Sequence, residues 1–231
     1  MRCGGLLVQS TIRGWRTYHN RYLGGQMLEK TIKKPIAAHA WPRARNDFYT
    51  EPLWVSGRLF DEEPFTGSIW DPACGMGHIT LSAAFHRYAT VASDIENRGG
   101  FLDDAQNVKR DFFSIDEQCD NIVTNPPFDI VQAFYKHAIE LARGKVAMIF
   151  PTMRLNAARW LERTPLRRIW LLTPRPSMPP GDVILAGKKA QGGRTDYCWL
   201  VWDLNEEAMH QTAPAVRWLH RDRAGQRPKI G

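Results

Sequence analysis

The sequence predicts an α/β fold in which helices cover a doubly wound, mostly parallel sheet of seven strands. Two observations carry this prediction. Short apolar runs typical of strands alternate along the chain with segments of helical period, and 231 residues with 43% hydrophobic content suffice to bury a full core. Strands separated by helices pair in parallel, because each helix returns the chain to the same end of the sheet.

These periods place the individual elements. Strands are expected at residues 67–71, 90–95, 108–112, 119–124, 145–150, 167–173 and 195–203, and helices at about 77–88, 129–142 and 155–163. In the second helix the apolar positions repeat at helical spacing, which indicates core packing and no cofactor site. These positions are Ile130, Phe134, His137, Ala138 and Leu141.

A glycine turn follows the first expected strand. The segment Asp71-Pro72-Ala73-Cys74-Gly75-Met76-Gly77 joins the run Ser68-Ile69-Trp70 to the first helix. Glycines at 75 and 77 permit positive φ and close approach of a ligand to the backbone. The helix start offers unpaired N–H groups to a carboxylate. A single Gly-x-Gly is weak evidence, so this turn needs support from elsewhere in the chain.

That support is the tetrapeptide Asn125-Pro126-Pro127-Phe128, which stands between an apolar run and an amphipathic helix. The lone pair of a planar amino nitrogen is delocalised, so the nitrogen is a poor nucleophile until its hydrogens are held. The Asn125 side-chain oxygen can accept one N–H and the carbonyl of Pro126 the other. Phe128 offers a flat face for a base. The tetrapeptide therefore suggests chemistry on an amino nitrogen, although it also occurs in ordinary turns.

Together these two segments resemble the class I S-adenosylmethionine-dependent methyltransferases, and more narrowly those that modify N6 of adenine in DNA. The resemblance covers roughly residues 47–203, with the cofactor motif at 71–77 and the catalytic motif at 125–128. It implies a Rossmann-like fold whose last strand, at residues 196–203, is antiparallel. It also implies S-adenosyl-L-methionine as cofactor and DNA as substrate.

Further positions are similar to this family's cofactor ligands. Asp94 ends the second expected strand, where the family binds the ribose hydroxyls; a helix cap is the alternative reading. Asp111 and Phe112 resemble the residues that bind the cofactor's adenine, unless they are only a strand end with core aromatics. The implied cofactor ligands are Tyr49, Thr50, Asp71, Ala73, Gly75, Gly77, Asp94, Ile95, Asp111, Phe112 and Asn125.

The segment Asp47-Phe48-Tyr49-Thr50-Glu51-Pro52 looks like the family motif that closes over the methionine moiety of the cofactor. The family's usual form is Thr-Pro, and here Glu51 stands between the two residues. This departure puts the contact of Thr50 in doubt. A capped helix start with Pro52 in its first turn is the alternative.

The chain is expected to consist of a basic extension at 1–46, a catalytic domain at 47–205 and a basic tail at 206–231. Residues 1–46 hold nine Lys or Arg and one acid, residues 47–143 hold 7 basic and 16 acidic residues, and residues 144–231 hold 15 basic and 7 acidic residues. An acidic segment between two basic ones suits an enzyme that acts on a polyanion. The extension is alternatively a disordered tail, a transit peptide or a mistaken upstream start. The tail is expected to be frayed.

The long irregular stretch at residues 174–194 resembles the family position that holds the flipped base and its phosphates. Arg175, Lys188, Lys189 and Arg194 are the expected phosphate contacts. A mobile solvated loop is the alternative.

The four cysteines form no CxxC pair, so neither a metal site nor a disulfide framework is expected. No apolar run of about 18 residues exists, and a soluble, cytoplasmic monomer or weak dimer is expected.

The expected mechanism is direct methyl transfer to a base rotated out of the duplex. Three rival readings remain: an RNA methyltransferase acting on adenine N6 or guanine N2, a protein glutamine methyltransferase, and a non-catalytic nucleic-acid-binding module. Methylation at C5 of cytosine would require a nucleophilic cysteine, typically after a proline, and no cysteine follows one here.

Overall fold

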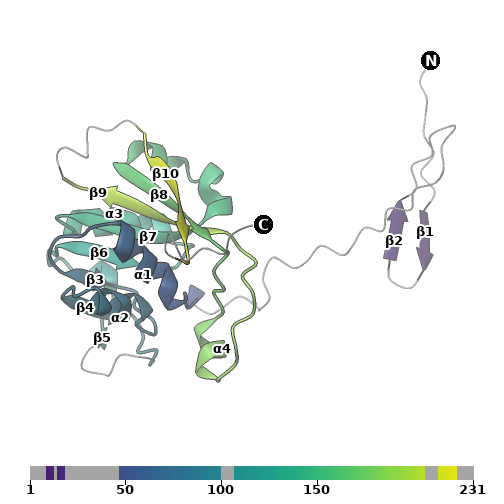
Figure 1. Ribbon diagram of the computed structural model, residues 1–231, viewed down its shortest axis with the longest axis horizontal. Coiled ribbons are helices and arrows are strands. Elements are labelled where there is room, and N and C mark those ends of the chain that lie inside the picture. Colours follow the sequence, from purple (N-terminus) through teal and green to yellow (C-terminus); the bar gives the residue numbers. More distant parts are fainter. Residues whose placement is uncertain (1–8, 13–14, 19–46, 100–106, 206–212, 223–231) are drawn as a thin grey trace, which may run out of the picture. The chain divides into compact units, whose positions relative to one another are not determined.

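The computed structural model describes residues 9–12, 15–18, 47–99, 107–205 and 213–222 (Figure 1). The chain divides into two compact units, Met1–Ala37 and Ala38–Gly231. In the first unit, β1 (Gln9–Ile12) pairs antiparallel with β2 (Trp15–Tyr18). The second unit contains the sheet that the sequence predicts.

That sheet has eight strands in the order β10-β8-β9-β7-β6-β3-β4-β5 (Figure 1). Its strands are β3 (Ile69–Asp71), β4 (Thr90–Asp94), β5 (Asn107–Lys109), β6 (Asn121–Thr124), β7 (Lys145–Pro151), β8 (Leu166–Thr173), β9 (Tyr197–Asp203) and β10 (Ala215–His220). Strand β9 is antiparallel to its neighbours β7 and β8, and every other pairing is parallel. The doubly wound, mostly parallel fold class is confirmed.

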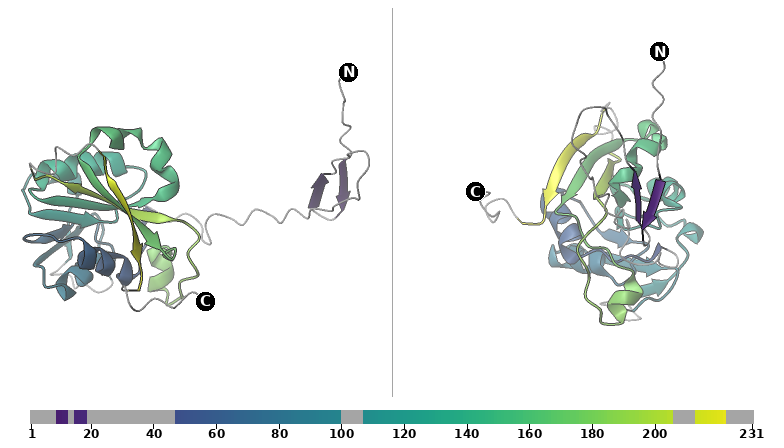
Figure 2. Two further views of the ribbon diagram at one scale, coloured as in Figure 1. Left: turned by 45° about the horizontal axis from the view of Figure 1, so that its top comes forward. Right: turned by 90° about the vertical axis from the view of Figure 1, so that its right-hand side faces the viewer.

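Helices cover both faces of this sheet (Figure 2). One face packs against α1 (Leu53–Glu62) and α2 (His78–Phe85). The other packs against α3 (Val131–Leu141) and the 3-10 segment η4 (Arg159–Arg163). The short elements η2 (Phe112–Ser114), η3 (Thr152–Ala157) and α4 (Gly181–Leu185) lie in the connections.

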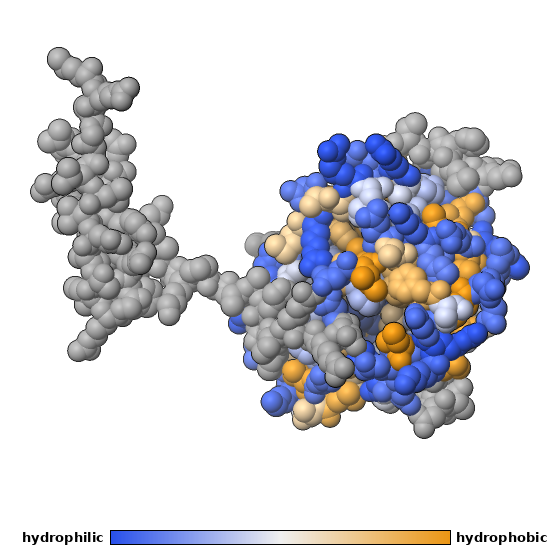
Figure 3. Space-filling model, turned by 180° about the vertical axis from the view of Figure 1, so that it is seen from behind, coloured by the Kyte–Doolittle hydropathy of each residue, from blue (hydrophilic) through white to orange (hydrophobic). Residues whose placement is uncertain are grey.

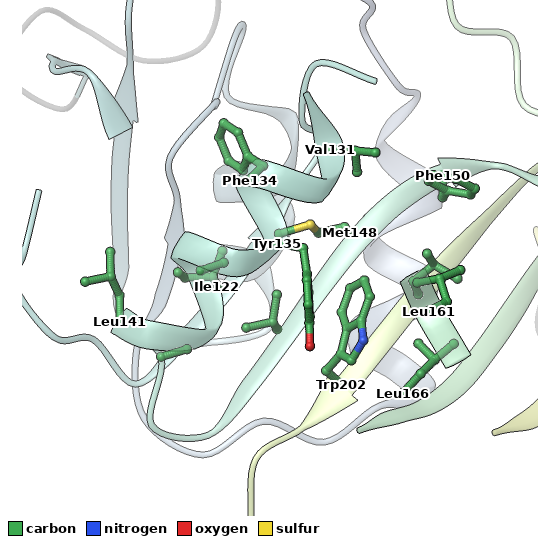
Figure 4. Packing of buried hydrophobic residues seen from close by; sticks show 14 of the residues in the cluster. Ile122, Val131, Phe134, Tyr135, Leu141, Met148, Phe150, Leu161, Leu166 and Trp202 are labelled. Atoms are coloured by element: carbon green, nitrogen blue, oxygen red, sulfur yellow. The ribbon is translucent and has the colours of Figure 1, made fainter. Parts of the chain in front are cut away.

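The central strands β6 and β7 are buried along their whole length because both of their faces are covered. Side chains alternate between the two cores, as strand geometry requires. In β7, Val146 and Met148 belong to the core under α3, whereas Ala147 and Ile149 belong to the core under α1. Figure 4 shows the first of these cores, in which Tyr135 of α3 lies beside Trp202 of β9.

A buried ionic cluster joins the end of α1 to this sheet. The Glu63 side chain follows α1 and is fully buried. Its carboxylate accepts hydrogen bonds from Lys145 Nζ at 2.6 Å, from Arg168 Nη2 at 2.9 Å and Nε at 2.5 Å, and from Trp170 Nε1 at 3.2 Å. Four donors of this kind satisfy a carboxylate that would otherwise be too costly to bury.

Two sequence-based expectations about the sheet and its helices are wrong. The sheet has eight strands because β10, inside the segment 206–231 that was expected to be a frayed tail, pairs parallel with β8. Its Leu219 side chain is 1% exposed, so apolar packing there outweighs the local basic charge. The helix expected at 155–163 is two 3-10 segments, η3 and η4, separated by Ala158 with ψ of 53°.

Helix α1 begins directly after Pro52, as the alternative reading of residues 47–52 expected, although Pro52 precedes the first turn and does not stand in it. Helix α4 was not predicted and lies inside the stretch that was expected to be irregular. The surface opposite the view of Figure 1 mixes orange apolar residues with blue hydrophilic ones, without one dominant apolar area (Figure 3). Among the described residues, no helix combines the length and the apolar character needed to span a bilayer.

Candidate functional site

A cavity of about 310 Å³ opens at the carboxyl ends of the central parallel strands. Asp71 ends β3, Asp94 ends β4, and Asn125 directly follows β6. Because neighbouring parallel strands end at one edge of the sheet, the three side chains share this cavity. The structure brings together every cofactor ligand that the resemblance implies except Gly77: Tyr49, Thr50, Asp71, Ala73, Gly75, Asp94, Ile95, Asp111, Phe112 and Asn125.

The glycine turn forms the floor of this cavity. Gly75 and Gly77 have φ of 52° and 84°, a region that only glycine enters at no steric cost. A Cβ at Gly75 would lie 3.1 Å from the Phe48 ring. Gly77 precedes α2 as its N-cap and does not line the cavity. Its role is therefore to turn the backbone into the helix.

Asp94 holds this turn in place. Its Oδ2 accepts from the Gly75 backbone N–H at 2.9 Å, and its Oδ1 accepts from that of Glu96 at 3.0 Å. Arg98 Nε lies 3.7 Å from the same carboxylate. A carboxylate has about four acceptor sites, so two remain for ligand hydroxyls. Residues 95–99 after Asp94 are not helical, so Asp94 does not act as the helix cap of the alternative reading; its carboxylate stabilises two turns and still faces the cavity.

Three buried carboxyl groups line the cavity. The side chains of Glu51, Asp71 and Asp94 are 6%, 1% and 6% exposed. Burial raises the pKa of Glu51 to about 7. Burial, together with the charges of Glu51 and Asp94, raises the pKa of Asp71 well above its usual range. A cation in the cavity would stabilise the ionised forms of these groups, so the electrostatics favour a cationic ligand.

The amide of Asn125 is held in one orientation. Its Nδ2 donates to the backbone carbonyl of Tyr49 and to Glu51 Oε2, both at 2.9 Å. These two bonds use both amide hydrogens and leave the side-chain oxygen as the group that can accept from a ligand. A flipped amide would place its oxygen against two acceptors. Asn125 is therefore set up as an acceptor at the cavity wall.

The rest of the tetrapeptide lies between the cavity and a second pocket. Pro127 lines the cavity, and Pro126 is buried. Phe128 is 8% exposed and lines a neighbouring pocket of about 190 Å³. There its ring centroid lies 5.9 Å from that of Tyr197. Both hollows share Asp47 and Tyr49 in their walls, so Asn125 and Phe128 stand where the two hollows adjoin.

Other members of the second pocket fix the tetrapeptide. Arg154 lines this pocket and donates from Nη1 to the Phe128 carbonyl at 3.2 Å. The same guanidinium lies 3.8 Å from the Asp129 carboxylate. Met153, also in the wall, is 72% exposed. This pocket therefore combines aromatic walls with one basic side chain at its rim.

The two residues expected to hold an adenine ring have additional structural roles. Asp111 caps η2, and its Oδ1 accepts from the Phe113 N–H at 3.1 Å. Phe112 is 3% exposed and stacks on Phe134, with ring centroids 4.3 Å apart. Both residues line the cavity, and so do Phe134 and Ile130, which were expected to pack only in the core.

The basic residues expected to contact phosphate lie outside both hollows. Arg175 forms an ion pair with Asp196 at 2.6 Å, and both side chains are exposed. Lys188, Lys189 and Arg194 are exposed in the connection after α4. None of the four lines the cavity or the second pocket. Their role in binding phosphate stays a prediction.

Several cavity residues were not identified from the sequence. Phe48 and Arg98 both line the cavity, and the Arg98 guanidinium lies 4.6 Å from the Phe48 ring centroid. Met76, whose Sδ accepts from the Thr50 hydroxyl at 3.5 Å, lines it as well. Glu51 was noted only as an interruption of a motif. Its position beside Thr50 is the one signal that the sequence offered.

Within the described part of the chain, no three His, Cys, Asp or Glu side chains are placed so that they could hold a metal ion. The cavity instead combines carboxylates, an oriented amide oxygen and a glycine turn. This set of groups can bind a cationic ligand with hydroxyl groups and can hold an N–H donor beside it.

No family model matches the chain, and no curated protein matches it either. Among solved structures it is similar to a Thermoplasma acidophilum protein, with 17% identity over 66% of this chain and 84% of that one and a TM-score of 0.46. A magnesium protoporphyrin IX methyltransferase from Synechocystis, solved with bound SAM, gives 13% identity, 65% and 76% coverage and a TM-score of 0.45.

The M protein of the type I restriction enzyme EcoKI is a further structural neighbour. It is 13% identical, with 73% of this chain and 47% of that chain covered and a TM-score of 0.47. Sequence identities this low, with TM-scores below 0.5, do not show which activity this protein has. The function therefore has to be inferred from the residues of the cavity.

Proposed function

We propose that this protein is an S-adenosyl-L-methionine-dependent methyltransferase that methylates the N6 amino group of adenine in DNA. The observation that carries the proposal is the fixed amide of Asn125, whose oxygen is left to accept a hydrogen bond beside an acidic cavity. The sequence resemblance at residues 71–77 and 125–128 agrees with this geometry.

The residues of the cavity fit the proposed cofactor. S-adenosyl-L-methionine supplies an electrophilic methyl group on a positively charged sulfur, and it carries an ammonium group as well. The buried carboxyl groups of Glu51, Asp71 and Asp94 complement such charges. The free acceptor sites of Asp94 suit the ribose hydroxyls, and Asp111 suits the adenine amino group. The positive φ of Gly75 lets the ligand approach the backbone of the turn, while the Gly75 N–H itself donates to Asp94.

The part of the site proposed to bind the methyl acceptor, formed by Asn125 and the second pocket, fits a planar amino group. The Asn125 oxygen can accept one N–H of such a group and thereby concentrate its lone pair on nitrogen, which is catalysis by positioning and electrostatics. The second pocket, with Phe128 and Tyr197 in its walls, offers aromatic faces to a purine. An adenine that reaches this pocket has to leave the duplex stack, at a cost of a few kcal/mol.

The charges of the chain favour a polyanion as substrate, and the sequence resemblance favours DNA among polyanions. Residues 1–46 carry nine basic residues and one acid, and Arg154 stands at the rim of the second pocket. Contacts to phosphate raise affinity without selecting a sequence. We propose residues 1–46 as the arm that contacts the nucleic acid, with the catalytic domain at 47–205.

The test is transfer of a labelled methyl group by the full chain to DNA, to RNA and to a glutamine-containing protein in parallel. Transfer to DNA that appears as N6-methyladenine supports the proposal, and exclusive transfer to RNA or protein overturns the substrate. Asn125→Ala should lower the rate roughly 10²–10³-fold while the cofactor Kd stays nearly unchanged. Asn205→Ala, an exposed amide outside the site, is the matched control. Ordinary turnover in Asn125→Ala would refute the assigned role.

A further inference from the structure

Glu51 is a buried acid that the proposed reaction does not itself require. Its side chain is 6% exposed and lines the cavity. Its backbone is fixed on both sides, because the Thr50 N–H donates to the Pro179 carbonyl at 3.0 Å and Pro52 starts α1. His78 Nδ1 donates to the Glu51 carbonyl at 2.5 Å. The carboxyl group is thus held in one place on a rigid segment.

The partner of this carboxyl group is the amide proposed to hold the substrate. Glu51 Oε2 accepts from Asn125 Nδ2 at 2.9 Å. The second hydrogen of Nδ2 is taken by the Tyr49 carbonyl, also at 2.9 Å. When Nδ2 faces them, the carboxylate and the Tyr49 carbonyl each accept one hydrogen, and when the amide is turned over both of them repel its oxygen. These two hydrogen bonds therefore determine that the side-chain oxygen of Asn125, and not its nitrogen, faces the place proposed for the substrate amino group.

We propose that Glu51 is a positioning residue that holds the Asn125 amide with its oxygen toward the amino group to be methylated. This inference rests on the proposed function for its kinetic consequence, but the positioning itself is a property of the unliganded protein. Charge-assisted hydrogen bonds of this kind are about twice as strong as neutral ones. An amide held in this way pays little entropy when it binds an N–H donor.

The hydrogen bond by which Glu51 orients the Asn125 amide should depend on pH. Burial raises the pKa of Glu51 to about 7. Below this value the carboxyl group is protonated, becomes a donor and can compete for the Asn125 oxygen, whereas above it the carboxylate only accepts. The facing groups are Asp71 on β3, Asp94 on β4 and His78 on α2. Burial lowers the pKa of His78. Above about pH 7 the carboxylate and the Tyr49 carbonyl therefore both favour this orientation, and below that pH the contribution of the Glu51 carboxylate is lost.

The first test follows the Asn125 side-chain NH2 signals by NMR between pH 6 and 8, assigned by their loss in Asn125→Ala. In the wild-type protein both signals should shift with a midpoint near pH 7. In Glu51→Gln, which keeps an oxygen at this position but does not titrate, they should stay constant. Signals that do not titrate in the wild type, or that titrate equally in Glu51→Gln, overturn the proposal whether or not the protein transfers methyl groups.

The second test is kinetic. Glu51→Ala should lower kcat roughly 10- to 100-fold at pH 8, where the wild-type carboxylate accepts from Asn125, and by less at pH 6. The Gln side chain of Glu51→Gln, like the protonated acid, carries both a donor and an acceptor, so this variant should show at pH 8 the lower rate that the wild type shows at pH 6 and should lose the change of rate between these pH values. Glu62→Gln removes the same charge at the exposed far end of α1 and is the matched control. An active wild type with an unchanged profile in Glu51→Gln overturns the Glu51 role alone. A wild type inactive on every acceptor overturns the proposed function, and the NMR titration still decides the Glu51 geometry.

Discussion

Replacement of Glu63 by Gln tests how α1 is attached to the sheet. The substitution keeps the volume of the side chain and removes its charge, and it turns one of the two acceptor oxygens into a donor. Lys145 and Arg168 then lose the carboxylate to which they now donate at 2.5–2.9 Å. Loss of one partner of a buried ion pair typically costs about 3–5 kcal/mol.

The structure places the expected loss at the lower end of that range, about 3 kcal/mol. Two features reduce it. Lys145 Nζ keeps the Asp203 carboxylate at 3.7 Å, and the Arg168 side chain is 22% exposed, so water can solvate part of its charge. For a chain of this size, about 3 kcal/mol lowers Tm by roughly 10 °C.

The measurement is urea unfolding at pH 7, followed by the same experiment in acid. Burial alone would raise the pKa of Glu63, but hydrogen bonds from Arg168 and Lys145 outweigh it, so the pKa falls below the usual value of 4.5. A carboxyl group whose pKa is lower in the folded than in the unfolded protein stabilises the fold at every pH above its unfolded pKa. This stabilisation is lost as the pH falls through the folded pKa. The difference between Glu63→Gln and the wild type should therefore be complete at pH 7 and shrink below about pH 4.

Glu162→Gln on η4 is the control, because this carboxylate is 69% exposed and lies 4.0 Å from Arg159. It should change the free energy of unfolding by less than about 0.5 kcal/mol. Since Glu63 does not line the cavity, the folded Glu63→Gln variant should keep its cofactor affinity at 25 °C. A loss below about 1 kcal/mol for Glu63→Gln would refute the reasoning about the buried cluster.

Three further predictions concern the surroundings of the cavity. In Gly181→Ala the new Cβ would overlap the Phe48 ring, so cofactor Kd by calorimetry should rise at least about tenfold; Gly192→Ala, where a Cβ meets open space, should leave it unchanged. Asp94→Asn removes a charged acceptor and should raise the same Kd about tenfold or more; an unaltered value counts against the ribose role. Burial raises the pKa of the Cys198 thiol to about 12, so alkylation of this residue at pH 8, located by mass spectrometry, should be far slower than in urea.

The parallel part of the sheet was predictable because its signals are local. Apolar runs in strands covered on both faces, such as β7 and β9, are continuous and bounded by polar residues. Apolar runs of this kind predicted the bounds of every strand from β3 to β9 to within a few residues. Strand β10 was missed because its Val216 and Trp218 side chains are exposed and basic residues surround it, so no buried period marks it. Its one strongly buried residue, Leu219, depends on packing that only the folded chain provides.

The cavity could be predicted in outline because its residues follow strands. Asp71, Asp94 and Asn125 each stand at the carboxyl end of an apolar run, and neighbouring parallel strands bring such ends together. Residues that reach the cavity from elsewhere had no such signal. Arg98 belongs to the connection after β4, and its place beside the Phe48 ring results from tertiary packing.

Glu51 shows why a departure from a motif can hold information that the motif lacks. An isolated Glu in a polar segment is normally exposed, so the sequence indicated only that the contact of Thr50 was in doubt. In the structure Thr50 lines the cavity nevertheless, because its N–H is held by the Pro179 carbonyl. The extra residue extends the segment by one position and turns its carboxyl group inward to the amide of Asn125, 74 residues further along the chain. The Glu51 side chain is buried only because the start of α1 and the end of β6 lie close together in the folded chain. This closeness is a property of the fold that the local sequence around Glu51 does not show.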